Sequence, residues 1–170
     1  MATIGELLQE LNQEAPATRR VLERVPEDQL DWRPHEKSMT LGQLALHVAG
    51  IPGRIAEISS RPTFDVRTQI PRPSPASVRE LLAELDQSVE KARTILGGMN
   101  DAALMTPWAM VDGTREVMAM PRGAVLRTVL FNHWYHHRGQ LTVYLRQVGA
   151  LLPAVYGASA DENPMAMQTA

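Results

Sequence analysis

The sequence predicts an all-α fold, a four-helix bundle in which residues 1–170 form a single domain. Four long segments repeat apolar residues every three or four positions, as amphipathic helices do. Proline and glycine separate these segments, and one connection is long enough to cross the bundle from end to end. A chain of 170 residues can bury a sizeable core, and an apolar content of 44% is ordinary for a globular protein.

The first helix is expected over residues 4–25 and the second over residues 41–60. The first has its apolar positions at Leu7, Leu8, Leu11, Ala15, Val21, Leu22 and Val25, and the second at Leu41, Leu44, Val48, Ile51, Ile55 and Ile58. Pro16 should kink or restart the first helix, and Pro26 should end it. Thr40 or Ser38 can cap the second helix, and Pro52 with Gly53 should kink or locally break it.

Residues 61–76 contain four prolines and predict an extended connection. Ser77 and Glu80 form a capping-box pattern that begins a third helix over residues 77–96. Residues 99–121 are irregular, but Asp112-Gly113 favours a turn, so a short hairpin or a long ordered loop is expected there. A fourth helix follows over residues 121–148. The C-terminal tail, 150–170, should dock through Leu151, Leu152, Val155 and Tyr156 before its end frays.

The fourth helix carries the strongest functional pattern. His133 and His137 are four residues apart, so they lie on one face about 5.4 Å apart along the axis. Their stripe also contains Leu126, Leu130, Leu141, Tyr144 and Val148, which predicts that both histidines point inward. Buried imidazoles need partners, and a metal ion would satisfy them. The alternative is two core histidines bonded to backbone or hydroxyl groups.

His47 lies at the border of the apolar stripe of the second helix and can supply a third ligand. Three imidazoles and an exchangeable water are typical of catalytic metal sites. The chain has no cysteine, which excludes thiolate ligands, disulfides and a cysteine nucleophile. Nitrogen ligation suits zinc, nickel, copper or iron without choosing among them. The alternative for His47 is a half-exposed surface histidine.

The other two histidines fit the site less well. His136 turns about 100° from the stripe, towards the surroundings of the site or the surface. His35 lies in a loop, where it is solvated or covers a pocket. Arg138 should point away from the metal and tie down the helix or pair with an acid. Gly139 costs about 0.5–1 kcal/mol in a helix, which favours a second helix packed close to it.

Four acidic residues are possible general bases, and each is more often simply solvated: Asp31, Glu36, Asp112 and Glu116. The aromatic residues Trp32, Trp108, Trp134 and Tyr135 could line a substrate pocket, although most such side chains pack, and Trp134 could face the core or a dimer partner. The methionines Met110, Met118 and Met120 favour loop packing over metal ligation.

Four segments of the sequence, the first two of which overlap, resemble the DinB superfamily, also called DinB/YfiT-like: WRPHEKSMTLGQLALHVA, MTLGQLALHVAG, HHRGQLTVYLRQVG and AVYGASADE. The resemblance covers nearly the whole chain. It implies a four-helix bundle in up-down-down-up order, often a homodimer, with His47, His133 and His137 as metal ligands. A divalent transition metal is expected, with Zn²⁺ or Ni²⁺ first.

The resemblance also suggests a metal-dependent enzyme, because some relatives are thiol transferases or thiol-dependent isomerases. A metal with an open position can lower the pKa of bound water or of a bound thiol. A thiol-dependent transferase using a small-molecule thiol as co-substrate is therefore expected, with a metal-dependent hydrolase as the related option. The alternatives are a non-enzymatic metal-binding stress-response protein and a chain that binds no metal.

Charge and hydropathy exclude two kinds of partner. The net charge is −2, with 17 basic and 19 acidic residues well mixed, so no nucleic-acid partner is expected. No apolar run approaches the roughly 20 residues that span a bilayer, so no membrane segment is expected. The first residues, MATIGELLQELNQ, lack the layout of a signal peptide, which predicts a cytoplasmic protein.

Overall fold

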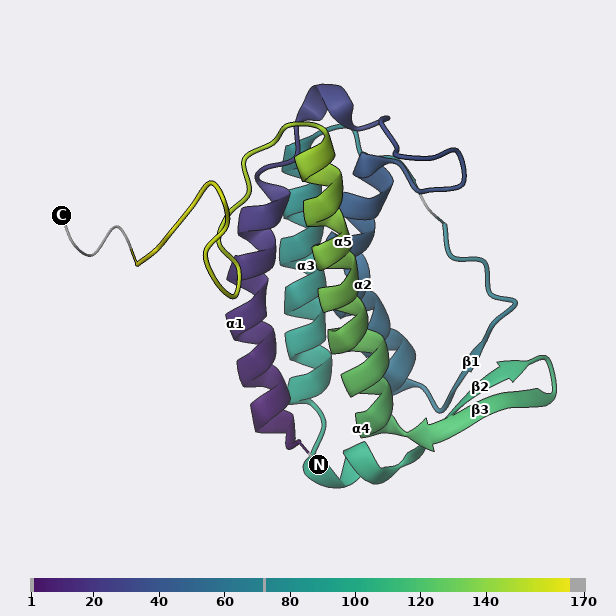
Figure 1. The fold of residues 1–170 in the computed structure, drawn as a ribbon. Helices are drawn as coiled ribbons and strands as arrows, with labels where there is room; N and C mark the ends of the chain where they lie inside the picture. The colour runs from purple at the N-terminus through teal and green to yellow at the C-terminus, as the bar shows by residue number, and fades with distance from the viewer. Residues whose placement is uncertain (1, 72, 166–170) are drawn as a thin grey trace.

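The chain folds into a four-helix bundle in the computed structural model, which describes residues 2–71 and 73–165. The long helices are α1 (Ile4–Leu22), α2 (Leu41–Ser60), α3 (Val78–Gly97) and a final helix made of α4 (Arg122–Val125), the π-helical segment η3 (Leu126–Asn132) and α5 (His133–Gln147). Figure 1 shows α1 rising, α2 and α3 descending and α5 rising. The up-down-down-up order is therefore confirmed.

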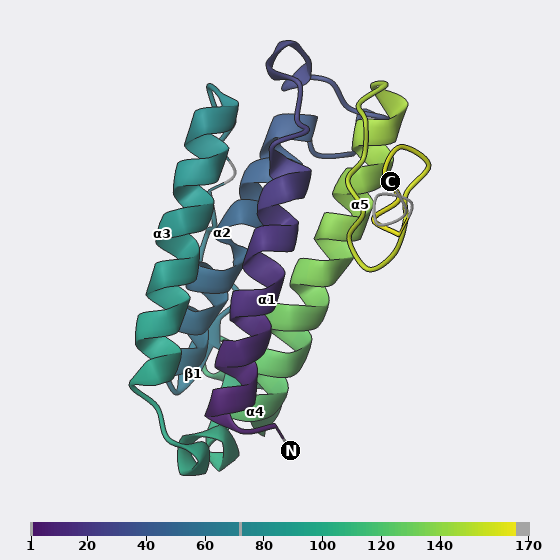
Figure 2. The same cartoon turned by 90° about the vertical axis from the view of Figure 1, so that its left-hand side faces the viewer.

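The four helices form a square, in which α1 packs beside α3 and α5 while α2 lies behind it between the same two neighbours (Figure 2). Each helix contributes a fully buried leucine to one shared core: Leu11, Leu44, Leu81 and Leu141. Because α2 and α3 run in the same direction, the chain must return along the bundle between them. The extended segment before α3 makes that crossover (Figure 1).

Side-chain caps set where the helices begin. Thr3 and Thr40 each form a complete capping box at the start of α1 and α2, so Thr40 rather than Ser38 is the cap of the second helix. Ser77 accepts a hydrogen bond from the Glu80 backbone, so α3 begins at Val78, one residue later than predicted. The helix α1 ends at Leu22, three residues before the predicted end, yet Val25 is still buried.

Proline does not interrupt either of the first two helices, so the predicted restart at Pro16 and break at Pro52 are not found. Pro52 has no backbone N–H to donate to the Val48 carbonyl. The indole of Trp134 donates to that carbonyl instead, at 3.0 Å. A hydrogen bond from a neighbouring helix thus replaces the one that proline removes.

A small sheet lies at the end of the bundle where α2 ends and α4 begins (Figure 1). Its strands are β1 (Thr63–Asp65), β2 (Pro107–Asp112) and β3 (Arg115–Pro121), in the order β1-β2-β3. The antiparallel β2–β3 pair confirms the predicted hairpin, with Gly113 at φ 65° in its turn. The parallel β1–β2 pair was not predicted, and it adds a sheet to a fold expected to be all-α.

The remaining elements connect these parts. Two short 3₁₀ helices, η1 (Glu27–Gln29) and η2 (Asp101–Met105), follow α1 and α3. Trp108, on β2, is buried, and its indole donates to the Ile58 carbonyl of α2 at 3.3 Å. Among the described residues, no helix is long and apolar enough to cross a membrane.

Candidate metal centre

Three histidines from two helices meet at one point. His47 lies on α2, His133 is the first residue of α5, and His137 follows one turn later. One ring nitrogen from each lies within 4.8 Å of the other two. The Nε2 atoms of His47 and His133 are 3.4 Å apart. Two imidazoles bound tetrahedrally at Zn–N distances of about 2.0–2.1 Å would place their nitrogens about 3.3 Å apart, so this spacing fits a metal ion.

Hydrogen bonds orient two of the three rings. The Nδ1 atom of His133 lies 3.2 Å from the Val129 carbonyl, and Nδ1 of His137 lies 2.8 Å from Oε1 of Gln140. A carbonyl oxygen only accepts, so each Nδ1 carries the hydrogen and each Nε2 keeps its lone pair. This arrangement is typical of metal-binding histidines. The sequence suggested no role for Gln140, although its three-residue spacing from His137 was visible.

The histidines are half-buried, at the edge of the apolar stripe. Leu130 and Leu141, on the same helix, are fully buried. The prediction of inward-pointing histidines is therefore correct only in part, since the cluster lies between the core and the surface. Burial, followed by the nearby His137, lowers the pKa of His133. A lowered pKa favours the neutral imidazole, which is the form that binds metals.

The π-helical segment η3 ends directly before His133. The backbone N–H of His133 donates to the Leu130 carbonyl, and the imidazole of the same residue faces the Val129 carbonyl. Single π-helical turns occur frequently at functional sites. Val125 and Phe131 are fully buried as well, although neither is on the stripe expected for this helix.

The other two histidines lie outside the cluster. His136 is exposed, with its ring centroid 4.9 Å from that of His137. His35 is exposed, and its Nδ1 accepts a hydrogen bond from the Lys37 backbone at 3.2 Å. Within the described part of the chain, no carboxylate and no further histidine joins His47, His133 and His137 as a possible ligand group.

The predicted general bases are not brought to the cluster. Asp31, Glu36 and Glu116 are exposed. Asp112 lies at the end of β2, where it forms an ion pair with Arg115 at 3.0 Å. The positions of the four acids therefore fit solvated side chains better than catalytic bases.

Most of the aromatic and methionine candidates pack within the protein. Trp108 and Trp134 are buried, which rules out a dimer contact for Trp134. Trp32 meets Tyr144 edge-on, with centroids 5.7 Å apart. The three methionines lie on the hairpin: Met110 pairs with Met118, and Met120 pairs with Trp108.

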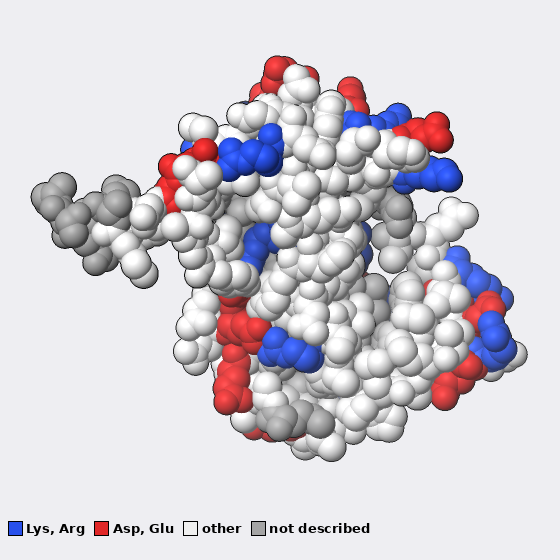
Figure 3. Space-filling model, viewed as in Figure 1, with Lys and Arg blue, Asp and Glu red and all other residues white. Residues whose placement is uncertain are grey.

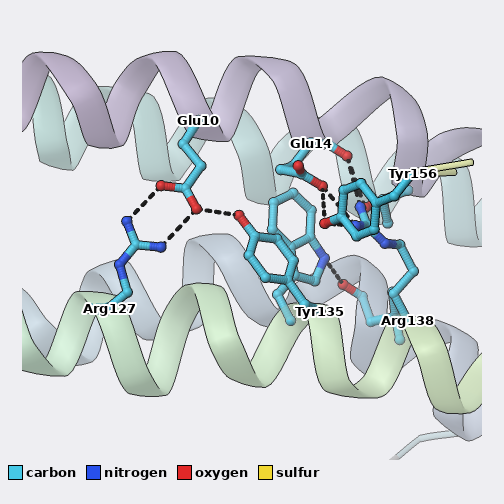
Figure 4. A network of polar contacts seen from close by, with 9 residues as sticks. Glu10, Glu14, Arg127, Tyr135, Arg138 and Tyr156 are labelled. Carbon is cyan, nitrogen blue, oxygen red and sulfur yellow. Dashed lines mark hydrogen bonds and ion pairs between the residues drawn. The ribbon is translucent and has the colours of Figure 1, made fainter.

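Arg138 confirms its predicted structural role (Figure 4). Its buried guanidinium forms an ion pair with Glu14 of α1 at 2.7 Å and donates to Thr18 Oγ1 at 3.0 Å. Tyr156, from the tail, donates to Glu14 at 2.9 Å, so the tail docks on α1 at this residue as expected, whereas Leu151, also predicted to dock, is 62% exposed. Gly139 is exposed, and nothing would lie within 4 Å of a Cβ there, so no described helix of this chain packs close to it.

A second part of the same network joins α1 to the start of the last helix (Figure 4). Arg127 binds both carboxylate oxygens of Glu10, at 2.7 and 2.6 Å. Tyr135 donates to the same carboxylate at 2.5 Å. The guanidinium lowers the pKa of Glu10, and burial raises the pKa of Tyr135. These contacts fix α5 against α1 on the side that faces away from the histidines.

A narrow cavity opens beside His47, between α2 and the crossover. It is lined by Gln43, Leu46, His47, Arg54, Pro71 and Pro73. None of the predicted acids is among the described residues that line it. The cavity is small, about 20 Å³, and it places Gln43 and Arg54 next to one of the three histidines.

Comparison with known proteins gives one consistent result. The model of the DinB family matches residues 1–166. The protein YrdA of Bacillus subtilis (strain 168) is 29% identical over 169 residues, covering 94% of this chain and 92% of YrdA. The crystal structure of a DinB-like protein from Bacillus cereus ATCC 10987 has a TM-score of 0.70 at 27% identity, covering 91% of this chain and 98% of that one. A second DinB-like crystal structure, YjoA of Bacillus subtilis, has a TM-score of 0.66 at 20% identity, with 88% and 96% coverage, and supports the fold alone.

Proposed function

The chain belongs to the DinB family, and we propose that it is a metal-dependent enzyme using one divalent ion held by His47, His133 and His137. The observation that carries this proposal is the convergence of three ring nitrogens without a fourth protein ligand among the described residues. Sites with three protein ligands keep a position for water or substrate, whereas structural sites have four. Zn²⁺ and Ni²⁺ are the ions proposed, since both accept imidazole nitrogen.

The proposed reaction is the transfer of a small-molecule thiol to an electrophilic substrate: the sulfur forms a bond to the electrophilic carbon, the leaving group departs from that carbon, and the thiol proton passes to the leaving group or to water. A bound metal ion would lower the pKa of a thiol or a water and so supply a nucleophile near neutral pH. The protein contributes neutral imidazoles, held by Val129 and Gln140, and the cavity beside His47. The chain has no cysteine, so the thiol has to come from outside. Hydrolysis is the related activity proposed for the same site, with water as the nucleophile in place of the thiol.

Metal analysis of protein purified without an affinity tag is the first test. Wild type is expected to bind one equivalent of Zn²⁺ or Ni²⁺, and His133→Ala is expected to bind less than about a tenth of that, because two imidazoles hold such ions weakly. His136→Ala is the matched control, since its ring is exposed and outside the cluster. Failure of wild type to take up either metal would refute the proposal.

A panel of thiols with an electrophilic acceptor, and of esters, then tests catalysis. If turnover disappears in His133→Ala while the melting temperature changes little, the enzyme proposal is supported. If wild type binds metal, turns over nothing and loses stability on chelation, the non-enzymatic metal-binding alternative holds instead. These two outcomes separate a metal that reacts from a metal that only stabilises.

We also propose that the protein is a homodimer that associates through α5 and the tail. Val143, Leu151 and Tyr156 are 57%, 62% and 71% exposed there. Figure 3 shows few charged side chains over α5, whereas charged groups gather towards the rim of this face. Light scattering should give a dimer mass for wild type and a monomer mass for Val143→Asp, with Val117→Asp on β3 as the control. A monomeric wild type would contradict the proposal.

The cytoplasmic location stays a prediction.

A further inference from the structure

Arg54 shares a face of α2 with His47. It follows His47 by seven residues, or two helical turns, and Gly50 lies between them on the same side. A Cβ added at Gly50 would lie 3.3 Å from Nη2 of Arg54, so the guanidinium bends back over the glycine towards His47. Both His47 and Arg54 line the cavity between α2 and the crossover. The cation is thus held about one turn from the histidine cluster.

Among the described residues, Arg54 has no hydrogen-bond or ion-pair partner. Five described arginines are buried or half-buried. The four other than Arg54 make hydrogen bonds or ion pairs: Arg19, Arg122, Arg127 and Arg138. Arg54 makes neither with any described residue, although it is half-buried and its cavity also contains Leu46 and two prolines. A guanidinium partly withdrawn from water is stabilised by an anion that it can bind through two N–H groups.

We propose that Arg54 binds a carboxylate of the substrate or thiol co-substrate while the reactive end of that molecule lies at the three histidines. This inference rests on the proposed function of the same site. A monoanion is favoured over a phosphate dianion because Glu84 lies beside Arg54: a Cβ at Gly50 would lie 2.9 Å from Oε1 of Glu84. That carboxylate repels a second negative charge. Arg54 is a positioning residue, since it binds the carboxylate end of the molecule and does not contact the reacting atom.

The test compares two thiols of the same shape on the Co²⁺-loaded protein. One is 3-mercaptopropionate and the other its amide, 3-mercaptopropionamide, and thiol binding is followed by the sulfur-to-cobalt absorption band. Wild type is expected to bind the carboxylate at least about tenfold more tightly, which corresponds to one charge-assisted ion pair of about 1.4 kcal/mol. Arg54→Gln should bind both thiols equally, and Arg54→Lys should recover part of the preference. Arg79→Gln, an exposed arginine on α3, is the control.

Gly50→Ala adds a test that leaves the charge in place. Its methyl group would lie 2.9 Å from Oε1 of Glu84 and 3.3 Å from Nη2 of Arg54, so both side chains have to shift. The preference for the carboxylate should then fall while the affinity for the amide stays near that of wild type. Equal binding of the two thiols by wild type, or an unchanged preference in Arg54→Gln, would overturn this inference and leave the metal site intact. If cobalt does not bind, or the absorption band appears with neither thiol, the proposed function fails together with this inference.

Discussion

Replacing Arg138 by methionine is expected to destabilise the protein strongly without changing how much metal it binds. The side chain is 3% exposed, and its guanidinium holds Glu14 of α1 at 2.7 Å. Methionine keeps much of the length and apolar volume of arginine but removes the charge. Glu14 would then keep its negative charge in a mostly buried position without its cation.

The structure sets the size of this effect. Removing one partner of a buried ion pair costs about 3–5 kcal/mol because the remaining charge is left uncompensated. Glu14 is 14% exposed and keeps the hydrogen bond from Tyr156, which places the expected loss at the lower end, about 3 kcal/mol. For a chain of this size, that loss corresponds to a melting temperature lower by about 6–12 °C.

Urea unfolding in the presence of a chelator measures the loss without a contribution from metal binding. The variants are Arg138→Met, Glu14→Gln and the double variant, which together form a double-mutant cycle. A coupling of about 2 kcal/mol is expected, since the glutamine carries no charge for arginine to balance. A loss below about 1 kcal/mol, additive effects, or a lowered metal content in Arg138→Met would refute the structural role of this arginine.

Three further predictions follow from particular contacts. Gly53→Ala should cost about 2–3 kcal/mol in unfolding free energy, because its Cβ would lie 2.7 Å from a backbone oxygen of α3. Gly139→Ala should instead raise the free energy of unfolding by about 0.5–1 kcal/mol, because nothing lies within 4 Å of its Cβ. Urea unfolding measures both variants, and two changes of the same sign would contradict this contrast. Trp134→Phe should cost about 1–2 kcal/mol because it removes the donor to the buried Val48 carbonyl, and a loss under about 0.5 kcal/mol would argue against that bond. Glu10→Gln should cost about 1 kcal/mol at pH 7. Since the pKa of Glu10 is lowered on folding from its ordinary 4.5, that difference should disappear as the pH falls below 4.5 and through the lowered value, and an equal difference at both ends would contradict the ion pair.

Local sequence determined most of the helical fold. Apolar spacing placed each helix within a few residues, and the Thr40 and Ser77 caps set two of the starts. The spacing of His133 and His137 placed both on one helix face for the same reason, because an α-helix returns to its face every three to four residues. These features depend on neighbours in the chain, so they are visible without a structure.

Only the tertiary structure brought His47 to the other two histidines and placed the Arg54 guanidinium beside the same cavity. The β1–β2 pairing and the indole of Trp134 at the carbonyl freed by Pro52 also join residues far apart in the chain. The π-helical segment before His133 depends on packing as well, because its extra residue per turn is unfavourable unless the surrounding core accepts it. Such contacts depend on which helices pack against one another, and a periodic pattern within one helix does not specify that packing.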